Sequence, residues 1–186
     1  MMRWRALAAV LVLALPGSLP LALPGTLPLP GALPLAAQQQ TDRIVILARH
    51  AEKLGGEDPA LSEAGEERAR ALAHVLSQWP VDAIYTSQFR RTRDTAAPLA
   101  EATGVAPLVV DARDMAALLS EIHEGGHRAI LVIGHSNTVP AIARALGAPD
   151  VQDIPEEGYD DLLVVTLSGE GEATLLHLKY GAPTPY

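Results

Sequence analysis

The sequence predicts an α/β fold: a three-layer α/β/α sandwich with a mostly parallel sheet and an antiparallel hairpin at its C-terminal end. Short apolar, β-branched runs alternate with stretches of helical length between residues 43 and 146, which is typical of a parallel sheet covered by helices. Two further strand-like runs, 162–167 and 173–178, flank the turn Ser168-Gly169-Glu170-Gly171 and predict the hairpin. The region after the leader has the usual size of one compact domain.

The first strand and helix follow from the residues directly after the leader. Residues 43–48 read RIVILA, a short β-branched run that predicts a buried strand. Ser62 is expected to cap a helix that runs to about Gln78, because several acids lie in its first turns, where the helix dipole favours them. The predicted apolar face of this helix consists of Ala64, Ala71, Leu72, Val75 and Leu76.

In the middle of the domain the sequence predicts two strands separated by a helix. Residues 81–85 form the second predicted strand, and the helix after it covers residues 89–102. Gly104 is expected to end that helix. A third short strand is predicted at residues 107–110.

The second half of the alternation ends in two further helices. A helix over residues 112–123 is expected to stop before Gly125 and its neighbour Gly126. The apolar run 128–133 predicts another buried strand, and a last helix is expected over residues 138–146.

The first 37 residues differ in composition from the rest. Arg3 and Arg5 precede an apolar run that ends at Leu15, which is typical of a signal peptide and too short to span a bilayer. A low-complexity Leu/Pro stretch follows to residue 37. Cleavage after Ala37 would leave a domain at residues 42–181 that is periplasmic or secreted, with no membrane span in the mature form; an uncleaved N-terminal anchor is the alternative.

Charge and cysteine content limit the partners and ligands. The formal net charge is −8, and it becomes −10 without the two leader arginines, so nucleic acid is not an expected partner. The chain has no cysteine, which excludes disulfides and thiolate metal sites. Positive charge for a phosphorylated substrate must therefore be local.

Chemistry-bearing side chains follow three of the predicted strands. Arg49 and His50 come directly after the first, His135 follows the 128–133 strand, and an arginine cluster that includes Arg91 follows the 81–85 strand. Because ligands bind beyond the carboxyl ends of parallel strands, these side chains are expected to converge on one pocket. A neutral imidazole can attack phosphorus and form a covalent intermediate, and arginines bind phosphoryl oxygens without a metal.

The motifs resemble those of the histidine phosphatase superfamily, in its phosphoglycerate mutase-like branch. The resemblance rests on the segments Arg49-His50-Ala51-Glu52, Ser87-x-x-x-Arg91-x-x-x-Thr95-Ala96 and Gly134-His135-Ser136. It implies a phosphatase in which His50 accepts the phosphoryl group, Arg49 and Arg91 bind its oxygens and His135 donates to it, with no cofactor and no metal. The short segment 111–126 resembles compact phosphohistidine phosphatase-like members.

The sequence departs from the family pattern at two positions and does not identify the general acid. Ala51 and Ser136 stand where the family usually has glycine. Many members carry an acidic general acid in a longer middle segment, and four acids here remain candidates for it: Glu52, Asp111, Asp114 and Glu121.

Two alternative functions fit the same residues. One is a phosphoglycerate mutase-type isomerase, and the other is a non-catalytic phosphate-binding module on the same fold. The expected partner is a phosphorylated small molecule or a phosphorylated component of the cell envelope. The oligomeric state and the physiological substrate cannot be read from the sequence.

Overall fold

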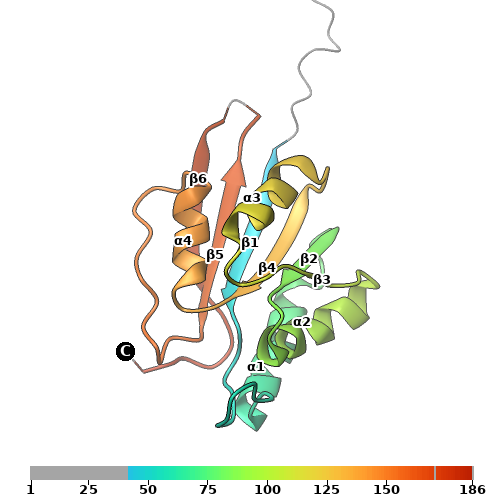
Figure 1. Ribbon diagram of the computed structural model, residues 1–186, viewed down its shortest axis with the longest axis vertical. Coiled ribbons are helices and arrows are strands. Elements are labelled where there is room, and N and C mark those ends of the chain that lie inside the picture. The colour runs from blue at the N-terminus through green and yellow to red at the C-terminus, as the bar shows by residue number, and fades with distance from the viewer. Residues whose placement is uncertain (1–41, 170, 186) are drawn as a thin grey trace, which may run out of the picture. The chain divides into compact units, whose positions relative to one another are not determined.

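The computed structural model describes residues 42–169 and 171–185, which form a six-stranded sheet with helices on both faces (Figure 1). The predicted leader at residues 1–37 and its cleavage site lie outside the described residues. The strand order is β3-β2-β4-β1-β5-β6. Strands β3, β2, β4 and β1 are parallel, and the β5–β6 hairpin is antiparallel. The predicted fold class is confirmed.

The elements alternate along the chain as the sequence predicts. The strands are β1 (Arg43–Arg49), β2 (Ala83–Thr86), β3 (Leu108–Val109), β4 (Ala129–Gly134), β5 (Asp161–Leu167) and β6 (Ala173–Lys179). The helices are α1 (Glu63–Leu76), α2 (Arg90–Thr103), α3 (Met115–Glu124) and α4 (Thr138–Ala145). No helix in the described part of the chain is both long and apolar enough to cross a membrane.

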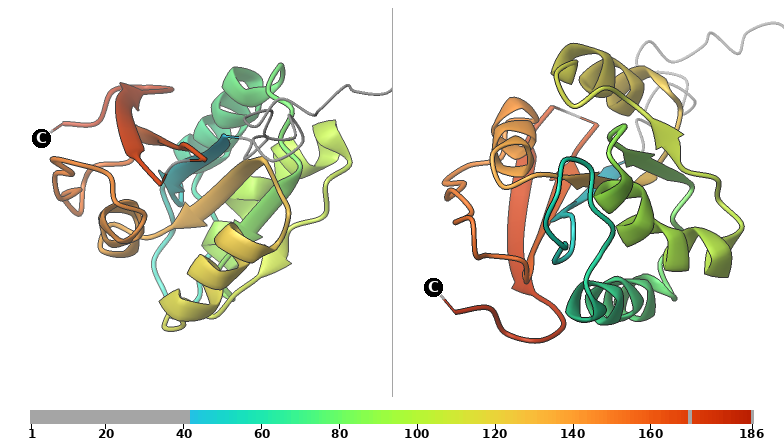
Figure 2. Two further views of the ribbon diagram at one scale, coloured as in Figure 1. Left: turned by 90° about the horizontal axis from the view of Figure 1, so that it is seen from above. Right: turned by 60° about the horizontal axis from the view of Figure 1, so that its bottom comes forward.

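The core has two halves, one on each face of the sheet. Alternate residues of β1 point to opposite faces, so Val45 and Leu47 pack with α3 and α4, whereas Ile46 and Ala48 pack with α1 and α2. All four of these side chains are fully buried. The views in Figure 2 show the two helical layers with the sheet between them. Because strands buried on both faces carry apolar residues at every position, β1 and β4 were recognisable as continuous apolar runs.

Three predictions about local structure are wrong in detail. Strand β3 has only two residues, both exposed at the sheet edge, and Pro107 before it has no N–H to donate to a longer ladder. Helix α3 begins at Met115 and not at Ala112, because the Asp114 side chain accepts from the N–H of Ala117 and caps the helix there.

The predicted apolar face of α1 is wrong in part: Leu72 and Leu76 are buried as predicted, but Ala64 and Val75 are not. Ala64 and Val75 are exposed, and the buried residues are Gly65, Arg68, Ala69, Leu72 and Leu76. A Cβ at Gly65 would lie 2.0 Å from the carbonyl oxygen of Glu52, so the helix can approach that loop only through glycine. The cap at Ser62 is as predicted, with its Oγ accepting from the N–H of Gly65 at 3.2 Å.

Candidate active site

The register of the sheet brings two histidines side by side. Strands β1 and β4 are adjacent and parallel, and Arg49 pairs with Gly134 at their carboxyl ends. The next residue of each strand is a histidine, and the N–H of His50 donates to the carbonyl oxygen of Gly134 at 2.9 Å. The centroids of the His50 and His135 rings lie 5.4 Å apart at an interplanar angle of 67°. The parallel pairing therefore places both rings at the same edge of the sheet.

Arg91 reaches this edge from the strand on the other side of β4. Strand β2 pairs with β4 up to Thr86, and α2 starts four residues later. The buried hydroxyl of Thr95 accepts from the N–H of Ala51 at 2.9 Å and donates to the carbonyl of Arg91 at 2.7 Å. Because Arg91 and Thr95 are one helical turn apart, this pair of hydrogen bonds holds Arg91 against the loop that carries His50.

All four predicted site residues line one cavity of about 360 Å³. The cavity is open at the carboxyl ends of β1, β2 and β4. Its lining residues are Arg49, His50, Lys53, Gln88, Phe89, Arg91, Ala112, Arg113, His135, Ser136, Asn137, Thr138 and Glu156. Arg90, the neighbour of Arg91, is not among them, and its Nε donates to Asp94 on the exposed face of α2.

Arg49 is fixed by the loop that precedes β5. Only 2% of Arg49 is exposed, and its Nη1 donates to the backbone carbonyls of Pro155 (3.0 Å), Glu156 (2.5 Å) and Gly158 (2.9 Å). The ring of Tyr159 lies 4.0 Å from the guanidinium carbon. Within the described residues the buried Nε has no hydrogen-bond partner. One edge of the guanidinium is thus held by the protein and the other retains an unused donor.

Arg91 has the same kind of unused donor. Its guanidinium carbon lies 4.3 Å from the ring centroid of Phe89, and its side chain is 15% exposed. Its one ion pair, with Asp58, is long at 3.9 Å, and its buried Nε has no partner in the described part of the chain. A buried donor without a partner costs about 1–3 kcal/mol. Two arginines with unpaired donors among the residues that line one cavity favour an anionic ligand there.

His50 is held in one tautomer by its neighbour. Its Nδ1 lies 2.8 Å from the carbonyl oxygen of Ala51, which can only accept, so Nδ1 carries the proton and Nε2 carries the free lone pair. His50 is 3% exposed. Burial, followed by the charges of Arg49, His135 and Arg91, lowers the pKa of His50 from 6.5 to about 3. The ring is neutral at physiological pH and has a nucleophilic nitrogen.

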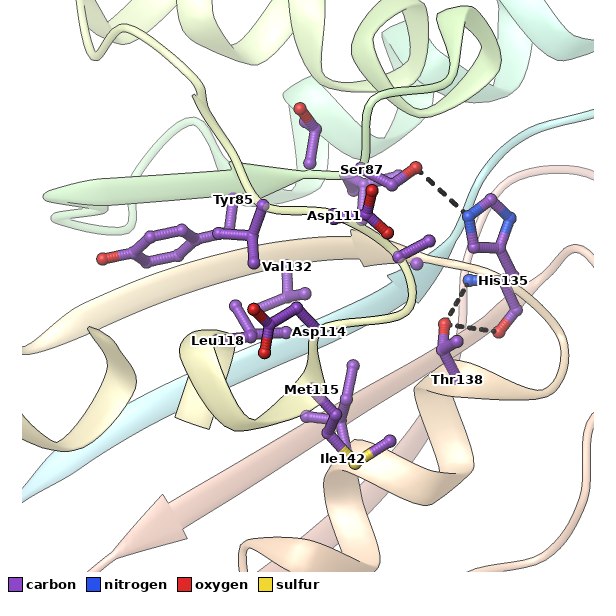
Figure 3. Close-up of a pocket in the computed structure, with 15 residues that line it drawn as sticks. Tyr85, Ser87, Asp111, Asp114, Met115, Leu118, Val132, His135, Thr138 and Ile142 are labelled. Atoms are coloured by element: carbon purple, nitrogen blue, oxygen red, sulfur yellow. Dashed lines mark hydrogen bonds between the residues drawn. The ribbon is translucent and has the colours of Figure 1, made fainter. Parts of the chain in front are cut away.

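His135 ends a short chain of hydrogen bonds, and Figure 3 shows the last of them, between His135 and Ser87. The Thr92 hydroxyl lies 2.8 Å from the carbonyl of Phe89, so it donates there and accepts from Ser87. Ser87 then accepts from Nε2–H of His135 at 3.1 Å, which leaves Nδ1 of that ring as the nitrogen that can face a ligand. Burial and the charges of Arg91 and Arg49 lower the pKa of His135 to about 4. A bound dianion would oppose the arginine charges and favour protonation at Nδ1.

Residues 45–114 match the family model of the histidine phosphatase superfamily, branch 1. The match includes Arg49, His50 and Arg91. The matched segment is less than half of the chain, and over it the chain is similar to the histidine phosphatase superfamily.

Curated relatives match only part of this chain. The PE-PGRS family protein PE_PGRS11 of Mycobacterium tuberculosis is 41% identical over 68 residues, which is 36% of this chain and 11% of that protein. Phosphoserine phosphatase 1 of Hydrogenobacter thermophilus is 44% identical over 66 residues, which is 31% of each chain. The chain therefore spans about a tenth and about a third of the length of these two relatives.

Solved structures share the fold over most of the domain. The protein histidine phosphatase SixA, solved with tungstate, superposes with a TM-score of 0.61 at 20% identity. The match covers 73% of this chain and 96% of the SixA chain. This likeness shows a common fold.

None of the four acids considered as a general acid lines the pocket that contains His50. Glu52 forms a bidentate ion pair with the buried Arg68, which also donates to the carbonyls of Tyr180 and Ala182. The Glu121 carboxylate accepts from the Tyr85 hydroxyl. Glu52 therefore acts in packing the C-terminal segment on α1.

The two aspartates line a second, mainly apolar cavity of about 40 Å³ behind His135. Figure 3 shows Asp111 and Asp114 there, together with Tyr85, Met115 and Leu118. The carboxylates of these aspartates accept from the backbone N–H groups of Arg113 and Ala117, respectively. Within the described residues no group of three or more His, Asp or Glu side chains is arranged to hold a metal ion.

Glu156 is the one acidic side chain that lines the pocket in the described part of the chain. Its carboxylate accepts from Nη2 of Arg49 at 3.2 Å and from the hydroxyl of Ser136 at 3.1 Å. Sequence reasoning missed it, because Glu156 lies more than a hundred residues from Arg49 in a turn without periodic pattern.

The two departures from the family glycines have structural explanations. Ala51 is fully buried, and its methyl group packs with Leu61 and Ala69 away from the cavity. Ser136 lines the cavity and uses its hydroxyl to bind Glu156. Neither side chain therefore obstructs His50.

The two lowered histidine pKa values predict how stability depends on pH. Between about pH 6.5 and about pH 4 the unfolded chain binds protons at these histidines that the folded chain does not bind, so the free energy of unfolding is expected to fall as the pH drops through this window. Urea unfolding at about pH 7 and about pH 5 measures the loss. His135→Asn is expected to reduce that loss, and an equal loss in both proteins would contradict the assigned shift.

Proposed function

We propose that this protein is a histidine phosphatase, which hydrolyses a phosphomonoester or related phosphoryl compound through a phosphohistidine intermediate on His50. The observation that carries the proposal is the orientation of His50: Nδ1–H is bound to the Ala51 carbonyl, and Nε2 is free in a cavity that Arg49 and Arg91 also line. A neutral imidazole in this state needs no base before it attacks phosphorus.

In the first step, Nε2 of His50 forms a bond to phosphorus while the bond from phosphorus to the leaving oxygen breaks. The oxygen departs with the electron pair of that bond and takes a proton from water or from an acid. The guanidinium groups of Arg49 and Arg91 donate to the phosphoryl oxygens, whose charge is spread over all three in the transition state. His135 donates to the same oxygens from Nδ1 once it is protonated.

In the second step, water attacks phosphorus and the bond to Nε2 breaks. The phosphorylated ring retains its proton on Nδ1 and therefore carries a positive charge, which the carbonyl of Ala51 stabilises at 2.8 Å. The ring can leave as a neutral imidazole without a further proton transfer. The same hydrogen bond thus supports attack in the first step and departure in the second.

The relatives support the proposal at the level of reaction class. One curated relative is named as a phosphoserine phosphatase, and one solved structure is named as a protein histidine phosphatase. Because these proteins differ in substrate, their names do not select one for this chain. The proposal includes action outside the cytoplasm, for which the Arg-containing, apolar leader is the support.

Hydrolysis of a chromogenic aryl phosphate by the purified protein, with and without EDTA, tests the proposed function. We expect turnover that EDTA does not reduce, because arginine and histidine side chains supply the positive charge at the phosphoryl group. Turnover that EDTA abolishes and a divalent cation restores would contradict the proposed mechanism. Absence of turnover with a range of phosphomonoesters would favour a phosphate-binding module.

A further inference from the structure

Two cations at the rim of the pocket are not needed to hold the phosphoryl group. Lys53 and Arg113 line the same cavity as His50, and both side chains are exposed. Neither forms an ion pair with another described residue. They are therefore available to a ligand that reaches beyond Arg49 and Arg91.

Both cations are attached to backbone that is held in place. Lys53 pairs with Leu61 in an isolated bridge, and the N–H of Leu54 donates to the carbonyl of Ala60 at 3.0 Å. On the other segment, the N–H of Ala112 donates to the Gln88 side chain at 2.9 Å and the N–H of Arg113 to Asp111 at 2.8 Å. The two charges thus come from two fixed segments on one cavity.

Lys53 and Arg113, unpaired among the described residues, are cations in a domain with a net negative charge. The chain is acidic, and several other exposed arginines have an acidic partner: Arg70 with Glu66, Arg90 with Asp94, and Arg144 with Asp153. Glu156, the one acid among the described residues that line the pocket, binds Arg49 and Ser136 and does not pair with Lys53 or Arg113. A cavity that retains positive charge in an acidic protein attracts anions.

We propose that the preferred substrate carries a second anionic group on its leaving group, and that Lys53 and Arg113 bind this group while Arg49 and Arg91 hold the phosphoryl group being transferred. The inference rests on the proposed phosphatase function and names the class of substrate for that site. A carboxylate and a second phosphate are the two sources of such a charge. Both would lie at the rim, on the side of the leaving oxygen.

Matched aryl esters isolate the charge of the leaving group. The purified full chain is assayed with 4-carboxyphenyl phosphate and with 4-carbamoylphenyl phosphate, which have nearly the same shape and differ in charge. We expect kcat/KM to be about fivefold higher for the carboxylate ester, because two partly exposed ion pairs would stabilise its binding by about that much. This preference should shrink at high salt, which screens exposed ion pairs. The amide has the better leaving group, so intrinsic reactivity would give the opposite order. A bisphosphate ester of hydroquinone distinguishes a phosphate from a carboxylate.

Variants connect the preference to the two side chains. Lys53→Gln and Arg113→Gln are each expected to reduce the carboxylate preference to about twofold, and the double variant is expected to remove it. Arg128→Gln is the matched control, because Arg128 is an exposed arginine at the opposite end of β4 and does not line the pocket. It removes the same charge and is expected to keep the preference.

The outcomes separate this inference from the function on which it rests. Turnover of both esters with no carboxylate preference, or a preference that the Lys53 and Arg113 variants retain, would overturn the inference and leave the phosphatase standing. Loss of the preference in the Arg128 variant would also overturn it, since the effect would then come from overall charge. If neither ester is hydrolysed, the proposed function fails and the inference fails with it.

Discussion

His50→Ala is expected to reduce kcat/KM for an aryl phosphate by at least about 10⁴-fold, because the variant has no atom to accept the phosphoryl group. Every substrate would transfer its phosphoryl group to the same atom, so the loss should not depend on the substrate chosen. The His50 side chain is 3% exposed, and its ring lies beside those of His135 and Tyr159. Steady-state kinetics at saturating substrate give kcat, and those at limiting substrate give kcat/KM.

A second histidine variant controls for the loss of an imidazole in general. His74 is exposed on α1 and lies outside the pocket, so His74→Ala is expected to retain activity within about twofold. Both variants should unfold at similar urea concentrations to the parent. Retention of more than about a tenth of the activity in a folded His50→Ala protein would contradict the nucleophilic role.

Arg91→Lys is expected to lower kcat/KM by about 10²–10³-fold, which is typical for the loss of a donor aimed at charge in the transition state. Lysine retains the charge but not the planar fork of donors with which arginine binds phosphoryl oxygens. Because the donor is used more strongly in the transition state than in the ground state, kcat should fall more than KM rises.

The neighbouring arginine provides the matched control. Arg90 is paired with Asp94 on the exposed face of α2, so Arg90→Lys is expected to change kcat/KM by less than about twofold. Equal losses in the two variants would show that the cluster acts through its summed charge. A larger loss at Arg90 would mean that the wrong arginine has been placed in the pocket.

The sequence predicted the parts of the fold that depend on local signals. Residues buried on both faces of β1 and β4 give continuous apolar runs, and Ser62 and Gly104 are caps with a local mechanism. The buried face of α1 was not predictable from periodicity, because Arg68 is buried only through its contacts with Glu52 and the C-terminal carbonyls. Burial of that charge depends on residues that are distant in the sequence.

The same distinction holds for the pocket. His50, His135 and Arg91 follow three adjacent parallel strands, so strand order and register alone bring them together. The sequence carries no local signal that loop 155–158 holds Arg49. The loop does so through backbone carbonyls, which every residue has. Glu156 enters the pocket with that loop, and only the three-dimensional structure reveals it.

Rapid quenching of the protein with a radiolabelled aryl phosphate, followed by peptide mapping, tests the covalent intermediate most directly. We expect phosphate on the His50 peptide within one turnover, in a form that is labile to acid and stable to base, and none in His50→Ala. An unlabelled protein during active turnover, or a label on another residue, would contradict direct phosphoryl transfer to His50.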